Sequence, residues 1–301
     1  MTCITAADSS IAALLAELSA PLEPIATSVT PRVQALLGIK AIVFDVYGTL
    51  LCSGVGDISV DQATDRDPAL REAMEAVGLT VARGKRFREK WVQEVRAHQD
   101  MGKQQGVEYP EVDICCVWGR FLEKMQAEGL LSGDLDSATL TRASVEYECR
   151  VNPAWPMPGF QALLDTLKAE HFHLGIISNA QFFTPTLLEV LSGKSLESLG
   201  FEEGGCLWSY RLLEAKPSVR LYQKSAMYWE SVHGIHPGEV LYVGNDLLND
   251  IWPAQKVGFR TALFAGDARS LRMHKGDTRV EGVAADLVIT ELNQIASAVH
   301  S

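Results

Sequence analysis

The sequence lacks the cysteine spacings of a zinc site or of a secreted disulfide framework. Its six cysteines form no C-x-x-C pair, and Cys115 and Cys116 are adjacent. We interpret them as thiols of a reducing compartment. The longest apolar run near the amino terminus, residues 11–16, is far shorter than the ~18 residues that a membrane span needs, and no basic residue precedes Arg32. These absences predict a cytoplasmic protein with no membrane partner.

The sequence also has fewer basic than acidic residues. The 27 lysines and arginines are outnumbered by 38 aspartates and glutamates, which gives a net charge of −11. Such a chain has no electrostatic hold on nucleic acid, although one locally positive site could still bind a small anionic substrate. The sequence contains no G-x-S-x-G or H-E-x-x-H motif, and SGKS at 192–195 has Leu188 where a phosphate-binding P-loop begins with glycine.

Apolar runs and helical patterns alternate in the second half of the chain. Runs that indicate buried strands lie at residues 39–45, 172–178, 240–243, 260–264 and 286–290. Amphipathic patterns that indicate helices lie between them, at 160–170, 184–191, 217–231 and 249–257. Strands separated by helices predict an α/β fold, with a doubly wound, mainly parallel sheet of Rossmann-like type.

Two further segments flank or interrupt this pattern. Residues 1–38 form an amino-terminal extension, with one helix expected at 11–19 and prolines after it. Residues 56–152 carry helical periodicity with no strand-like alternation, so we expect a helical domain inserted after the first strand. The core is then made of residues 39–55 and 153–301.

Four polar residues stand at or just after predicted strands or turns: Asp45, Ser178, Lys216 and Asp246. Parallel sheets bring the carboxyl ends of their strands to one edge, where such side chains meet. A carboxylate is a weak nucleophile, and a nearby ammonium group or metal ion keeps it ionised and lowers the cost of approach by an anionic substrate. The pattern predicts covalent catalysis by a carboxylate.

Four motifs in this order resemble the haloacid dehalogenase (HAD) superfamily. They are FDVYGTL at 44–50, IISNA at 176–180, EAKPSVRLY at 214–222 and VGNDLLND at 243–250. The resemblance implies a HAD core in which the helical insert is a cap. It makes Asp45 the nucleophile and Lys216 the group that neutralises charge.

The resemblance also implies a substrate site and a metal site. Substrate-binding positions would be Tyr47, Thr49, Arg88, Ser178 and Asn179. A Mg²⁺ ion would be held by Asp45, the carbonyl of Tyr47 and Asp246. Whether Asn245 or Asp250 joins that shell stays open, as do the substrate and the oligomeric state.

Tyr47 departs from the superfamily's phosphatases, which usually have a second aspartate there to protonate the leaving alcohol. FDVYGTL is instead similar to the motif of the 2-haloacid dehalogenases, whose halide leaving group needs no proton. Arg88, within FREKW, and Tyr222 agree with that pattern.

VGNDLLND lacks the dehalogenase pattern, and its carboxylates suit a cation. The leading expectation is therefore Mg²⁺-dependent hydrolysis of a small phosphorylated metabolite. The alternatives are a metal-independent 2-haloacid dehalogenase and a non-catalytic binding protein that retains the fold.

Overall fold

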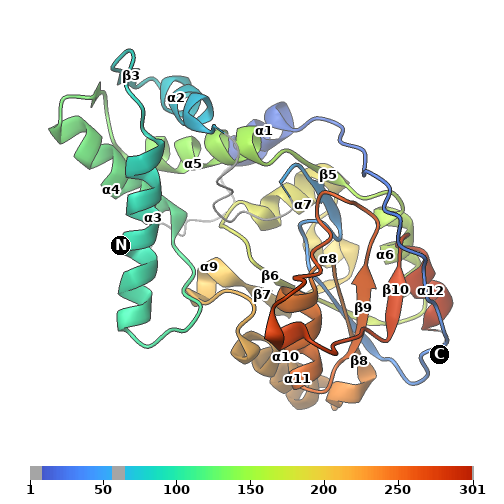
Figure 1. Ribbon diagram of the computed structural model, residues 1–301. Helices are drawn as coiled ribbons and strands as arrows, with labels where there is room; N and C mark the ends of the chain where they lie inside the picture. Colours follow the sequence, from blue (N-terminus) through green and yellow to red (C-terminus); the bar gives the residue numbers. More distant parts are fainter. Residues whose placement is uncertain (1–8, 56–64, 300–301) are drawn as a thin grey trace.

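A computed structural model describes residues 9–55 and 65–299. Its centre is a six-stranded, all-parallel sheet in the order β10-β9-β8-β1-β6-β7 (Figure 1). This confirms the predicted α/β architecture. The strands are β1 (Ala41–Phe44), β6 (His173–Ser178), β7 (Phe201–Trp208), β8 (Val240–Gly244), β9 (Arg260–Phe264) and β10 (Leu287–Ile289).

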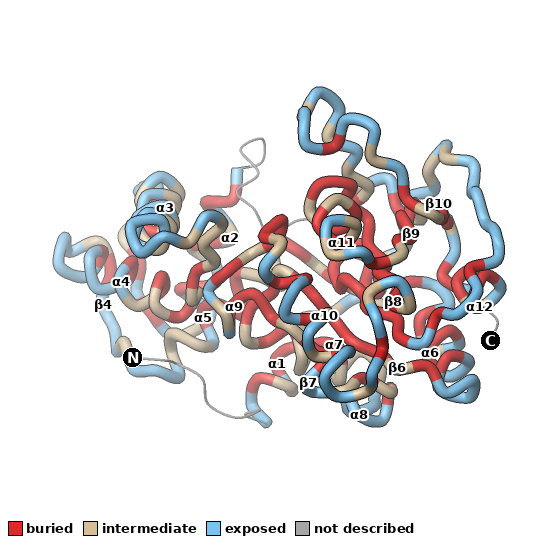
Figure 2. Tube along the Cα trace, turned by 90° about the horizontal axis from the view of Figure 1, so that it is seen from below, coloured by how far each residue is buried: buried red, intermediate tan, exposed pale blue. Residues whose placement is uncertain are grey.

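Helices cover both faces of this sheet because its strands are apolar on both sides. In β1, Ile42 and Phe44 face one buried cluster, and Ala41 and Val43 face another. The first cluster is closed by α6 (Phe160–Ala169), α7 (Thr184–Ser192), α8 (Leu196–Leu199) and α12 (Gln294–Ala298). The second is closed by α10 (Val219–His233) and α11 (Trp252–Lys256). The strands therefore lie in the middle of three layers, where Figure 2 shows most of their residues as buried.

The helical insert forms a second body at one side of the core (Figure 1). Its helices are α2 (Asp67–Ala76), α3 (Arg88–Gln104), α4 (Ile114–Ala127) and α5 (Ser137–Val151). They enclose their own hydrophobic cluster, in which the rings of Trp91 and Trp118 lie 4.6 Å apart. Within the described residues, no helix has the length and apolar character to cross a membrane.

Two short ribbons accompany the insert. β2 (Leu51–Ser53) and β5 (Ala154–Pro156) pair antiparallel where the chain leaves the core and returns to it. β3 (Thr80–Val81) and β4 (Leu131–Ser132) pair inside the insert, where the sequence shows no strand pattern. Strands of two or three residues are too short to produce a detectable alternation.

The amino-terminal extension reaches from the cap side to the far edge of the sheet (Figure 1). Its helix α1 (Ser9–Leu18) buries Leu14 and Leu15 in the main core. The chain then runs past the sheet to β10, where the backbone N–H of Arg32 donates to the carbonyl of Val288 at 2.7 Å. The extension thereby covers the backbone of an edge strand that would otherwise be open to pairing.

β7 is the strand that the sequence analysis missed. In its sequence, FEEGGCLW, the first residue is followed by two glutamates and two glycines, which strands disfavour. It lies at the other edge of the sheet and pairs only with β6 among the described strands. Of the features singled out from the sequence, Cys3 and most of the polar stretch after β2, residues 56–64, lie outside the described residues.

Candidate active site

Asp45 follows β1 directly, at the carboxyl end of a central strand. Its backbone N–H donates to the carbonyl of Val243 in β8 at 2.9 Å, which continues the sheet's pairing to this residue. Ser178 is the last residue of the neighbouring strand β6. The strand order thus places the two side chains at the same sheet edge.

Two side chains donate hydrogen bonds to the Asp45 carboxylate, and both bonds go to the same oxygen. Oδ1 accepts from Ser178 Oγ at 2.9 Å and from Lys216 Nζ at 2.7 Å. Within the described part of the chain, no hydrogen bond reaches Oδ2. Asp45 is 6% exposed, so this arrangement orients a nearly dry carboxylate and leaves one oxygen available for attack.

Lys216 lies between two carboxylates. Its Nζ donates to Asp45 Oδ1 at 2.7 Å and to Asp250 Oδ1 at 2.6 Å. Burial alone would lower the pKa of this ammonium group, but Asp250 and Asp45 outweigh burial, so the pKa lies above its ordinary value. Asn179 fixes the backbone here, because its Oδ1 accepts from the N–H of Lys216 at 2.8 Å. Lys216 therefore stays charged beside Asp45.

Asp250 is a central member of the site to which the sequence assigned no firm role. It is fully buried and also accepts from the Tyr242 hydroxyl and from the N–H of Asp246. Burial raises the pKa of its carboxyl, and the charge of Lys216 opposes that rise. A Cβ at Gly244 would collide with this carboxylate, so the glycine of VGND makes room for it. The sequence clue to this role was the position of Asp250 shortly after the end of the predicted strand that became β8.

Thr49 and Asn245 bond to each other across the site. Thr49 Oγ1 donates to Asn245 Oδ1 at 3.0 Å, and Asn245 Nδ2 donates to the carbonyl of Ser270 at 2.7 Å. Gly48 makes the turn between β1 and Thr49, with φ of +84° and no space for a Cβ beside Asn245. The pair ties the loop after β1 to the end of β8.

Tyr47 points its hydroxyl at Thr184 of α7 and not at Asp45. Its Oη lies 3.0 Å from Thr184 Oγ1, and the residue belongs to the main hydrophobic core. Burial raises the pKa of this phenol well above its ordinary value. The side chain that stands two residues after Asp45 is therefore a poor proton donor or acceptor for a reaction at Asp45.

Replacing Tyr47 with phenylalanine should change stability and not turnover. The variant loses one buried hydrogen bond, which costs about 1 kcal/mol in the free energy of unfolding. Thr184 keeps a partner, since its Oγ1 also accepts from the N–H of Gln181. Urea unfolding and steady-state kinetics measure the two effects. A fall in kcat of more than about tenfold would instead give the phenol a role in proton transfer.

Asp246 is turned towards its own helix. Its Oδ1 accepts from the N–H groups of Leu248 and Asn249 at 2.8 and 2.7 Å, and Oδ2 accepts from Asn249 Nδ2 at 2.9 Å. His274 Nε2 lies 2.8 Å from Oδ1, and this contact raises the pKa of His274. The carboxylate thus caps the helical turn that follows β8 and pairs with an imidazole.

These contacts bear on whether the site fits Mg²⁺, which binds oxygen donors with vacant lone pairs. Both oxygens of Asp246 are engaged, and Asn245 is neutral and already bonded on both sides of its amide. In the described part of the chain, Asp45, Asp246 and Asp250 do not bring ligand atoms within 4.8 Å of one another as a group. As arranged here, each oxygen of Asp246 already accepts hydrogen bonds from groups of the protein.

A cavity of about 600 Å³ lies between insert and core. Lys216 and Asn179 line it from the core, and Arg88 and Trp91 line it from α3. Asp67 fixes the start of α3, because its Oδ1 accepts from the backbone N–H of Arg88 at 2.9 Å. Five basic side chains line the cavity against three acidic ones: Arg66, Arg88, Arg96, Lys103 and Lys216 against Glu108, Glu111 and Glu148.

Fold and site together are those of an α/β hydrolase with an inserted helical body and a buried carboxylate at the end of a central strand. Comparison with protein families matches residues 39–258 to the haloacid dehalogenase-like hydrolases. The chain belongs to this family. None of the curated proteins matches it.

Solved structures of similar fold include both kinds of enzyme in the family. A 2-haloacid dehalogenase from Pseudomonas syringae pv. Tomato is 18% identical, with a TM-score of 0.51 over 86% of this chain and 97% of that one. A HAD phosphatase from Thermococcus onnurineus is 17% identical, with a TM-score of 0.48 over 86% and 97%. An L-2-haloacid dehalogenase from Xanthobacter autotrophicus is 20% identical, with a TM-score of 0.46 over 86% of this chain and 97% of that one.

Proposed function

We propose that this hydrolase acts on 2-haloalkanoic acids, through an ester formed at Asp45 and without a metal ion. The observation that carries the proposal is the state of Tyr47. At the position where a phosphatase needs a proton donor for the leaving alcohol, this chain has a buried phenol bonded to Thr184. A halide leaves without a proton, so its displacement requires no proton donor at residue 47.

The first step is attack on carbon. The Oδ2 atom of Asp45 displaces the halide from C2 of the substrate, which leaves with its bonding electrons. Lys216 and Ser178 hold Oδ1 meanwhile. In the second step water attacks the carboxyl carbon of the ester, and its proton passes to Asp250, which Lys216 joins to the nucleophile. Asp250 returns this proton to the alkoxide oxygen, which leaves as the hydroxyl of the 2-hydroxy acid. The remaining proton of the water is released from the Asp45 carboxyl to solvent, and Asp45 returns as a carboxylate.

Phosphoryl transfer with Mg²⁺ is the second candidate. It is favoured by the presence of three carboxylates, Asp45, Asp246 and Asp250, around one sheet edge. For that reaction Asp246 would have to exchange its bonds to Asn249 and His274 for a bond to the ion. The proposed dehalogenation needs no such rearrangement.

A substrate panel with and without metal separates the two. Purified protein is assayed for halide release from 2-haloacids that range from chloropropionate to longer-chain bromo acids, since the cavity exceeds the smallest of them. We expect halide release that is the same in EDTA and in Mg²⁺. Absence of halide release from every member overturns the proposal. Phosphate-ester hydrolysis that requires Mg²⁺ and Asp45 would establish the second candidate.

Arg88 should set the affinity for the substrate carboxylate. Replacing Arg88 with methionine removes one charge from the cavity wall, and a hydrogen bond between charged groups is worth about 1.5–3 kcal/mol. We therefore expect KM for the haloacid to rise by about 10- to 100-fold. Steady-state kinetics on the active haloacid measures this change.

Arg86 provides the matched control for Arg88. It lies two residues earlier, is 71% exposed and pairs with Asp65 at 2.9 Å. Because it does not line the cavity, Arg86→Met should leave KM unchanged. If both variants raise KM equally, the effect comes from the overall charge of this segment and Arg88 has no particular contact with substrate.

A further inference from the structure

A second group of titratable side chains lies at the opposite end of the sheet from Asp45. His173 is the first residue of β6, whereas Ser178 of the active site is the last, roughly 17 Å further along the strand. Glu202 is on the neighbouring strand β7, and His233 is the last residue of α10. Within the described residues, this is the one group whose His, Cys, Asp or Glu ligand atoms all lie within 4.8 Å of one another.

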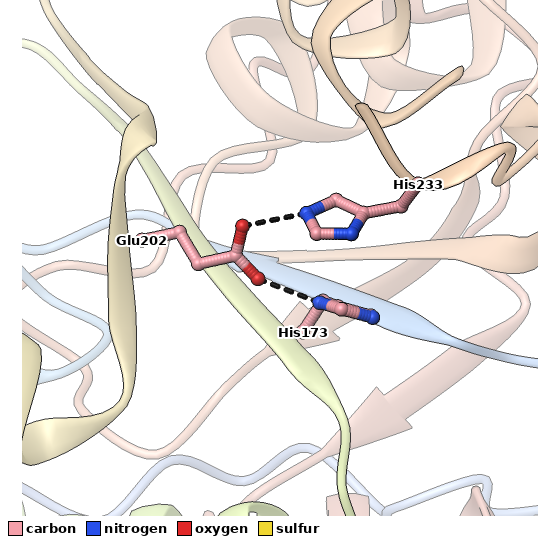
Figure 3. Close-up of side chains that lie close together, drawn as sticks. All are labelled: His173, Glu202 and His233. Atoms are coloured by element: carbon pink, nitrogen blue, oxygen red, sulfur yellow. Dashed lines mark hydrogen bonds and ion pairs between the residues drawn. The ribbon is translucent and has the colours of Figure 1, made fainter. Parts of the chain in front are cut away.

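The carboxylate of Glu202 points to both imidazole rings, one oxygen to each (Figure 3). Oε1 is 2.6 Å from His173 Nδ1, and Oε2 is 2.7 Å from His233 Nε2. The two rings lie with their centroids 3.9 Å apart. One nitrogen of each ring and one oxygen of Glu202 therefore lie within 4.8 Å of one another.

The surrounding residues hold this geometry. The Tyr228 hydroxyl donates to Glu202 Oε2 at 2.8 Å. The ring of Trp229 packs beside both imidazoles, with ring centroids 6.3 Å from that of His173 and 5.8 Å from that of His233. The glycines in FEEGG, which made β7 hard to recognise, allow this approach, because a Cβ at Gly204 or Gly205 would collide with those two aromatic rings.

We propose that His173, Glu202 and His233 bind a divalent transition-metal ion of the Zn²⁺ type. Two histidines and one glutamate are a common three-residue set for Zn²⁺, with Zn–N of about 2.0–2.1 Å and Zn–O of about 2.0–2.2 Å. On a tetrahedral ion such atoms stand about 3.4 Å apart, so the two N–O contacts, one to each oxygen of Glu202, have to widen by less than about 1 Å. The three side chains are 35%, 27% and 22% exposed, which leaves the fourth position open to water.

Binding moves protons in a defined way. Each histidine gives up the proton on the nitrogen that faces Glu202 and carries one on its other ring nitrogen instead, so both rings bind as neutral ligands. Imidazole donors select Zn²⁺, Ni²⁺ and Cu²⁺ over Mg²⁺. The ion joins two strands and a helix far from the nucleophile, so we assign it a structural role in fastening α10 to the edge strand β7.

The test is Zn²⁺ titration of the full-length protein by calorimetry after removal of metal with a chelator. We expect one equivalent to bind, to raise the unfolding temperature, and to be unaffected by excess Mg²⁺ or by Asp45→Asn. His173→Gln and His233→Gln should each abolish saturable binding, and Tyr228→Phe should weaken it by about tenfold. His236→Gln is the matched control, since that exposed histidine follows the same helix without joining the group.

A second measurement does not depend on how well the variants fold. Co²⁺ added to the wild-type protein should give the visible absorption of a four- or five-coordinate ion, and Zn²⁺ should displace it. No binding in the wild-type protein, or binding that survives both histidine replacements, overturns the proposal and leaves the three residues as a hydrogen-bonded network. Loss of binding in Asp45→Asn would place the ion at the active site and overturn it equally.

Discussion

Replacing Asp45 with asparagine is expected to lower kcat by about 10⁴-fold or more while the protein stays folded. The amide oxygen can still accept hydrogen bonds from Ser178 and Lys216, so the local structure is kept. The amide has no anionic oxygen to attack carbon or phosphorus, so no covalent intermediate forms. Halide or phosphate release under saturating substrate measures the loss, and this outcome is shared by both candidate reactions.

The covalent step can be followed directly. In isotope-labelled water, a single turnover of the wild-type protein should leave heavy oxygen in the peptide that contains Asp45, because water attacks the carboxyl carbon of the ester. Asp267→Asn is a matched control: Asp267 is also buried but pairs with Arg269, and turnover should be retained. Turnover in Asp45→Asn within tenfold of wild type would contradict covalent catalysis at this residue.

Stability separates the role of Asp45 from a structural one. Lys216 keeps its second partner, Asp250, when Asp45 becomes neutral, so no buried charge is left unpaired. The free energy of unfolding of Asp45→Asn should equal or exceed that of the wild-type protein. Urea denaturation checks this, and a strongly destabilised variant would mean that the lost activity reflects misfolding.

The sequence was informative where chemistry and periodicity agree. Asp45 and Ser178 each close an apolar run, so their place at one sheet edge followed from the parallel topology. The sequence pattern did not predict β7, because the first half of this strand is polar and glycine-rich. Its strand conformation comes from pairing with β6 and packing under α10. Tertiary contacts, which a local pattern does not contain, decide such a segment.

The direction of a side chain is the second thing that the sequence could not supply. Asp246 and Asp250 are four residues apart in one motif, yet Asp250 binds Lys216 whereas Asp246 caps the next turn and meets His274. His274 lies in a loop with no motif of its own. The choice between the two carboxylates is made by backbone N–H groups and by that distant imidazole, so motif spacing alone left the ligand set open.

Replacing Lys216 with methionine should destabilise the protein by about 3–5 kcal/mol and abolish turnover, because it leaves two buried carboxylates without a cation. Lys90→Met is the matched control, since that exposed lysine pairs with Glu128 at the surface and contributes at most about 1 kcal/mol. Urea unfolding of both variants gives the comparison. Adding Asp250→Asn to the methionine variant should recover part of the loss.

The stability of the Lys216→Met variant should change with pH in one direction. Without Lys216, which lowers it, the pKa of the buried Asp250 carboxyl lies further above its value in the unfolded chain. A group whose pKa is raised on folding adds stability at low pH and loses it as the pH rises through the folded value. The methionine variant should therefore unfold less readily at about pH 5 than at about pH 8.

In the wild-type protein the pKa of Asp250 is also raised by burial, but Lys216 opposes that rise, so the pH dependence there should have the same sign and a smaller size. The pKa of the Lys216 ammonium is raised as well. Its contribution is complete below the unfolded lysine pKa of about 10.4 and is lost only as the solution becomes more alkaline. Lys216 should thus add nothing to the pH dependence between about pH 5 and pH 8. A methionine variant that gains stability with rising pH would show that the two carboxylates are hydrated, and the dry site proposed for attack by Asp45 would have to be abandoned.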